Sequence, residues 1–95
     1  MNELEKFSTQ LIKQIKTNKI SSNLYIKIWK GKDDILDNIS GVSIVNDSGQ
    51  VISHIQLIEL ECDENYIDLA IKIGQNVGKQ LEAKNYNIEV INQIN

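Results

Sequence analysis

The first hydrophobic pattern along the chain repeats every three to four residues and predicts an amphipathic helix over residues 3–18. Lysines occupy the positions between the apolar residues, so one face is suited to a core and the other to solvent. The apolar positions are Leu4, Phe7, Leu11, Ile12 and Ile15.

The next pattern has a period of two and predicts a strand over residues 24–29. Successive side chains of a strand point to opposite faces of its sheet. We therefore expect one set to enter the core and the other to face away from it. The two sets are Leu24, Ile26 and Ile28 on the core side, and Tyr25, Lys27 and Trp29 on the other.

The middle of the chain predicts a turn, a hairpin and two more strands. Residues 35–39 are too few for a full helix and predict a turn that places Ile35 or Leu36 on the core. Residues 41–45 read as a strand, and the Asn-Asp-Ser-Gly sequence at 46–49 favours a hairpin turn.

The third predicted strand, residues 50–61, does not keep its alternation. Val51, Ile55 and Leu57 occupy odd positions, whereas Ile52, Ile58 and Leu60 occupy even ones. Either a β-bulge near residues 54–56 shifts the register, or both faces of this strand are partly covered.

A second amphipathic helix is predicted from a cap at Asp63 or Asn65 to about residue 83, followed by a strand over residues 86–90. Two of its apolar positions are Gly74 and Gly78. Glycine inside a helix costs about 1 kcal/mol relative to alanine, so we expect close approach to the sheet or to the first helix. A phosphate loop is not expected, because these glycines lie within the helix.

The resulting order is α-β-β-β-α-β, which predicts an α+β fold. We expect a mainly antiparallel sheet of three to four strands with two helices on one face. With 95 residues, the chain is long enough for one domain, here taken as residues 1–95.

Charge is distributed unevenly along the chain. Residues 1–32 hold seven lysines and two acids, whereas residues 33–95 hold three lysines and eleven acids. The two parts could attract each other within the fold, form two faces for two partners, or support self-association. The net charge of −3 and the absence of arginine argue against a general nucleic-acid binder.

Other features of the composition predict a cytoplasmic protein. No apolar run approaches the roughly 20 residues of a membrane-spanning helix. The first residues are acidic where a signal peptide is basic. The single cysteine, Cys62, cannot form an internal disulfide, which fits a reducing compartment.

Residues with catalytic chemistry are few, and no catalytic, cofactor-binding or metal site is expected. His54 and Cys62 would lie about 26 Å apart along one extended strand, too far for a nucleophile and base. Asp33, Asp34 and Asp37 lack the spacing of a calcium loop and read as a solvated turn.

The strongest candidate for a binding surface combines aromatic residues with lysines. Such a combination can anchor a macromolecular interface. Alternatively, a helix or loop covers this side of the strand and Trp29 belongs to the core. The candidate partner-binding residues are Tyr25, Lys27, Trp29, Lys30 and Lys32.

From Leu24 to Val90 the chain resembles the C-terminal domain of hydroxymethylbilane synthase. The similarity lies in Asp47-Ser48-Gly49-Gln50-Val51-Ile52 and in the helix containing Gly74 and Gly78. The resemblance implies an open three-stranded antiparallel sheet with helices on one face. It does not imply the activity, because the family's cofactor-bearing cysteine has no counterpart in residues 18–23 and the catalytic domains are absent.

Together these patterns favour a small non-catalytic module that binds a macromolecular partner. A protein partner is expected ahead of a nucleic acid, and a homodimer is compatible with the charge layout. Size and composition suit an inhibitor or accessory protein of a phage or mobile element. The alternative is a small-ligand-binding or enzyme domain whose pocket forms at a dimer interface.

Overall fold

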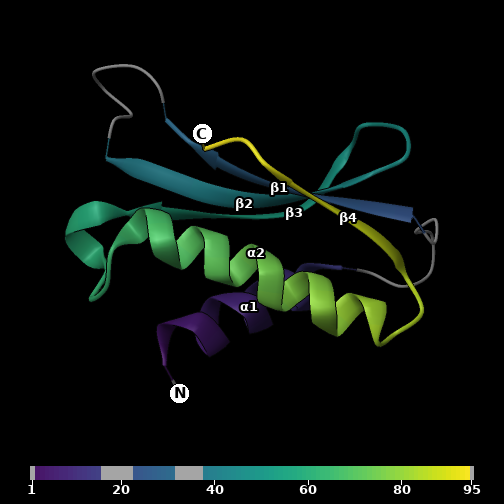
Figure 1. The fold of residues 1–95 in the computed structure, drawn as a ribbon, viewed down its shortest axis with the longest axis horizontal. Helices are drawn as coiled ribbons and strands as arrows, with labels where there is room; N and C mark the ends of the chain where they lie inside the picture. Colours follow the sequence, from purple (N-terminus) through teal and green to yellow (C-terminus); the bar gives the residue numbers. More distant parts are fainter. Residues whose placement is uncertain (1, 16–22, 32–37, 95) are drawn as a thin grey trace.

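The computed structural model describes residues 2–15, 23–31 and 38–94, in which two helices pack on one four-stranded sheet (Figure 1). The element order α-β-β-β-α-β confirms the predicted α+β class. The elements are α1 (Glu3–Gln14), β1 (Asn23–Lys30), β2 (Ile39–Asn46), β3 (Val51–Ile58), the short 3-10 turn η2 (Glu59–Glu61), α2 (Tyr66–Glu82) and β4 (Asn87–Asn92).

The strands lie in the order β3-β2-β1-β4. β2 is antiparallel to both β1 and β3, while β4 is parallel to β1. A parallel neighbour needs a long crossover, and here α2 lies in the connection that leads to β4. The sheet is therefore mostly antiparallel but has a fourth, parallel strand beyond the three that the synthase resemblance implies.

Both helices lie on the same face of the sheet, as predicted, and the core fills the space between them (Figure 1). The apolar side of β1 is fully buried there, together with the inner positions of β2 and β3 and the apolar stripe of α2. The largest buried side chains are Leu11, Leu24, Ile26, Ile28, Ile44, Leu57, Leu69, Ile73 and Leu81.

Buried hydroxyl groups fix each helix to the sheet. Ser53 in β3 donates a hydrogen bond to the carbonyl of Leu11 in α1, with 2.7 Å between the oxygens. Ser40 in β2 donates to the carbonyl of Tyr66 at the start of α2, at 2.8 Å. A buried hydroxyl is costly unless it has a partner, so these bonds favour one placement of each helix.

The first helix is shorter than predicted. α1 ends at Gln14 because Ile15 has an extended backbone, with φ −77° and ψ 117°. The amphipathic pattern that extended the prediction to residue 18 therefore outlasts the helix itself. Residues 16–18 lie outside the described part of the chain, as does most of the predicted turn at 35–39.

The irregularity predicted in the third strand is a bulge, but it lies closer to the hairpin than predicted. Ile44 pairs with Ser53 whereas Val45 pairs with Val51, so Ile52 is the extra residue. The hairpin itself forms as predicted, with Gly49 at φ 81°. β3 also ends at Ile58, before the predicted residue 61.

The second helix matches its predicted range closely. Asn65, rather than Asp63, caps it: its side-chain oxygen accepts from the backbone N–H groups of Ile67 at 3.0 Å and Asp68 at 3.1 Å. The helix is followed by a turn in which Asn85 has φ 72°. An asparagine tolerates this left-handed conformation better than most residues.

The two glycines of α2 allow the helix to approach the sheet closely, as predicted. A Cβ atom at Gly74 would lie 2.6 Å from Cγ1 of Ile28. One at Gly78 would lie 3.2 Å from Cγ2 of Val90. The contact is therefore with β1 and β4, which decides between the two alternatives that the sequence left open.

Candidate functional site

The sheet face opposite the helices, here called the outer face, is the candidate functional surface. Strand pairing fixes which residues share it, because directly paired residues point to the same side. Three rows of neighbours cross this face: Glu89, Tyr25, Val45 and Val51; Ile91, Lys27, Ser43 and His54; and Trp29, Gly41 and Gln56.

Three of the predicted partner-binding residues lie on the outer face. Tyr25, Lys27 and Trp29 are each half-buried, while the residues that alternate with them in β1 are buried under the helices. In the described residues no helix lies over this face (Figure 1). The alternation in β1 thus places the aromatic rings and the lysine where the sequence predicted.

Trp29 lies on its own sheet instead of projecting freely into solvent. Its indole N–H donates to the hydroxyl of Ser43 at 3.1 Å. A Cβ atom at Gly41 would lie 2.5 Å from Cε2 of the indole, so the ring rests on this glycine. An aromatic ring that covers a glycine in the neighbouring strand is a recognised device of β-sheets. Trp29 is consequently held in one orientation, with one ring face against the sheet.

The remaining predicted site residues do not join this group. Lys30 pairs with the buried Ser40, and paired residues point to the same side of the sheet. Lys30 therefore lies on the side that faces the helices. Lys32 lies outside the described residues. Among the described residues the lysine of the outer face is therefore Lys27.

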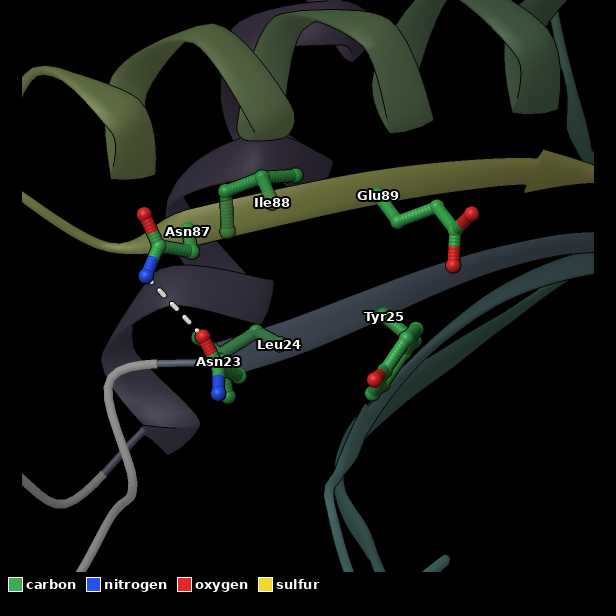
Figure 2. Close-up of a pocket in the computed structure, with 6 residues that line it drawn as sticks. All are labelled: Asn23, Leu24, Tyr25, Asn87, Ile88 and Glu89. Carbon is green, nitrogen blue, oxygen red and sulfur yellow. Dashed lines mark hydrogen bonds between the residues drawn. The ribbon is translucent and has the colours of Figure 1, made fainter.

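A shallow hollow of about 210 Å³ opens where β1 and β4 begin (Figure 2). The side-chain amide of Asn87 donates to the side-chain oxygen of Asn23 at 2.9 Å. In Figure 2 the side chains of Tyr25 and Glu89 lie on the side of the sheet away from α2. The hollow is thus a polar extension of the outer face, with a carboxylate beside a phenol.

Sequence reasoning missed the residues that β3 and β4 contribute to the outer face. Val51 is 59% exposed at the hairpin end, and Ile91 lies beside Lys27. The alternation in residues 86–90 separates Glu89 from Ile88, which was a usable signal. Nothing in the sequence indicated that β4 would lie next to β1.

The two residues with nucleophilic or basic chemistry are not assembled into a catalytic site. His54 is exposed on the outer face, while Cys62 follows η2. Burial, followed by the negative charges of Glu3 and Glu61, raises the pKa of the Cys62 thiol. The thiol is therefore protonated at neutral pH and a poor nucleophile.

No group of three or more His, Cys, Asp or Glu residues in the described chain is arranged to hold a metal ion. The acidic residues Asp33, Asp34 and Asp37 fall outside the described ranges. Neither helix of residues 2–15 and 38–94 is long and apolar enough to cross a membrane.

Comparisons with protein families, curated proteins and solved structures find no match to this chain.

Proposed function

We propose that this protein is a small binding module and that its outer face binds an acidic surface of another protein. The observation that carries the proposal is the position of Trp29. Its indole is held against Gly41 and bonded to Ser43 on a sheet face that no described helix covers. A fixed aromatic ring loses little conformational entropy on binding, which suits it to anchor an interface.

The neighbours of Trp29 indicate which chemical groups the partner would present. Tyr25 and Lys27 lie along the same strand, so two aromatic rings flank one ammonium group. The ammonium group favours a carboxylate on the partner, and the rings favour apolar or aromatic side chains. An inhibitor or accessory protein of a phage or mobile element would act through such a surface.

A protein fits this face better than a nucleic acid does. The whole chain carries a net charge of −3 and has no arginine. Nucleic-acid binding is dominated by contacts between basic residues and phosphates, and the row of the outer face that contains Tyr25 also contains the carboxylate of Glu89.

The test compares partner capture by the wild type and by a variant that carries Trp29→Ala and Lys27→Glu. Each protein is immobilised and exposed to lysate of the cells that make it, and the captured proteins are quantified by mass spectrometry. We expect one protein to be captured by the wild type and at least about 90% of it to be lost with the variant. This corresponds to a tenfold or greater loss of affinity, about 1.4 kcal/mol.

The matched control carries Leu60→Ala and Lys84→Glu, which make the same kinds of change away from the outer face. Leu60 is 89% exposed after β3, and Lys84 is exposed after α2. This control should retain capture. Equal capture by all three proteins, with native circular dichroism for each, would contradict the proposal. Lys27→Glu alone decides the matter if Trp29→Ala disturbs the fold.

The alternative is a small-ligand or enzyme domain. The hollow beside Tyr25 is about 210 Å³, smaller than the roughly 300–1,000 Å³ of most ligand pockets. Native mass spectrometry of the purified protein would detect a retained small molecule. A folded Cys62→Ser variant that lost the biological effect would favour the enzyme over the binding module, because Cys62 follows η2 and is not part of the outer face.

A further inference from the structure

The two edges of the sheet differ in how their backbone groups are satisfied. At the β3 edge, the side-chain amide of Gln14 bonds to both backbone groups of His54. It donates to the carbonyl and accepts from the N–H, each at 3.1 Å. Gln14 thereby occupies the place of a neighbouring strand at that residue. β4 forms the other edge, and in the described residues no strand pairs with its outer side.

The backbone groups that β4 turns outward follow from its pairing with β1. The N–H of Gln93 donates to the carbonyl of Ile28 at 2.7 Å, so residue 93 points its backbone groups inward. Backbone groups alternate in direction along a strand. Ile88, Val90 and Asn92 therefore present their N–H and C=O groups at the free edge.

A groove runs along this edge between α2 and β4. It has a volume of about 480 Å³ and is lined by Gln75, Gly78, Lys79, Glu82 and Val90. Val90 is 40% exposed and is one of the exposed large hydrophobic residues of the described chain. Proteins usually protect such edges with proline, an inward lysine or a bulge. This chain contains no proline, and the paired part of β4 has a regular register.

We propose that β4 pairs with β4 of a second copy of this chain, antiparallel about a two-fold axis through Val90. An axis perpendicular to the sheet pairs one residue with itself, and Val90 presents both backbone groups outward. It would form two hydrogen bonds with Val90 of the second copy, and Ile88 would pair with Asn92 of that copy. An axis through Glu89 would instead place two carboxylates directly opposite each other, which is unfavourable.

Charge complementarity on the outer face favours a second copy over a foreign strand. With the axis at Val90, Glu89 of the second copy lies opposite Ile91. Ile91 is next to Lys27, so carboxylate and ammonium flank one isoleucine in the same row. Two-fold symmetry repeats this arrangement, so each copy supplies one lysine and one glutamate to the two pairs.

The helix side of the proposed interface is also self-complementary. Gly78 packs over Val90, so the axis passes near this level of α2. The two copies of α2 run antiparallel across the axis, and Gln75 of one copy then lies level with Glu82 of the other. The side-chain amide of Gln75 in one copy then faces the carboxylate of Glu82 in the other across the groove, and Lys79 lies between these two positions on α2. The two sheets become one eight-stranded sheet with a continuous outer face.

The test measures self-association by sedimentation equilibrium from micromolar to millimolar concentration, without any other partner. We expect the wild type to be dimeric and Val90→Pro to be monomeric. Proline at 90 removes an N–H that points away from β1, so the β1–β4 bonds remain. Gln56→Pro is the matched control, because residue 56 turns its backbone groups to the β3 edge as His54 does. It should stay dimeric.

A second variant keeps the proposal testable if proline disturbs the strand. Glu89→Lys changes an exposed side chain and places two lysines beside Ile91 in each row of the dimer. We expect its self-association to weaken about tenfold, because the two favourable charge arrangements across the interface become repulsive. A wild type that stays monomeric at millimolar concentration would overturn the proposal. So would folded Val90→Pro and Glu89→Lys variants that dimerise as the wild type does.

Discussion

At the scale of single residues, small side chains decide how closely the layers approach. Gly74 brings α2 onto β1, and Gly41 receives the ring of Trp29 on the opposite face. Each glycine removes one Cβ atom at a point where two elements would otherwise collide. The same residue type therefore serves the core on one side of the sheet and the candidate binding face on the other.

We predict that Gly74→Leu destabilises the fold by about 1–3 kcal/mol or more, because the new side chain overpacks the contact with Ile28. Thermal and denaturant unfolding measure the change. Gly78→Ala is the comparison: its Cβ would lie 3.2 Å from Val90. Val90 needs to shift only slightly to accept this Cβ atom, and alanine gains about 1 kcal/mol over glycine in helix propensity, which offsets the cost of the shift. An unchanged midpoint for Gly74→Leu would mean that this helix face is not packed as described.

At the scale of secondary-structure elements, the ends of the elements depend on polar side chains more than on hydrophobic pattern. Asn65 begins α2 by accepting two backbone bonds, and Asn2 begins α1 by accepting from the N–H of Glu5 at 2.8 Å. The side-chain amide of Gln14 likewise bonds to the backbone groups of His54 at the β3 edge. These residues satisfy backbone groups that the elements themselves leave without a partner.

We predict that Gln14→Ala destabilises the protein by roughly 0.5–1.5 kcal/mol, since both bonds to His54 are exposed to solvent. Amide hydrogen exchange at His54 should accelerate, while exchange at Ile55, whose backbone faces β2, should change little. Gln14→Glu keeps the acceptor and loses the donor, so its His54 N–H should remain partly protected. Equal exchange of His54 in the wild type and Gln14→Ala would show that the amide does not protect this edge.

At the scale of the whole molecule, an acidic cluster on the helix side lies across the sheet from Lys27. Acidic residues gather where α1 and α2 begin, and they contribute to the raised pKa of Cys62. Lys72 on α2 is engaged by Glu64, with 3.2 Å between nitrogen and oxygen. Lys27 lies on the opposite side, between Ile91 and Ser43.

We predict that capture of the acidic partner weakens severalfold when ionic strength rises from about 0.1 M to about 1 M. The Debye length falls from about 10 Å to about 3 Å over this range. Lys27→Met should reduce this salt dependence, whereas Lys72→Met on the helix side should leave it unchanged. The same salt dependence in Lys27→Met as in the wild type would remove this lysine from the interface.

Local periodicity was sufficient to determine the element order, the hairpin and the buried side of β1. Tyr25, Lys27 and Trp29 could be assigned to one face from alternation alone, because side-chain direction in a strand is a local property. The position of Lys30 directly after Trp29 predicts that it joins this face, but the same alternation places it on the helix side. The bulge at Ile52 was detected as a loss of phase, but its exact position depends on pairing with β2.

Only the tertiary structure decided which strands are neighbours and which segments form the edges. The parallel contact of β4 with β1 joins residues more than sixty positions apart, and it brings Glu89 and Ile91 onto the outer face. The closing of the β3 edge by Gln14 and the resting of Trp29 on Gly41 are likewise contacts between separate elements. Hydrophobic period determines which side of an element is buried, whereas packing of the whole chain determines what lies beside it.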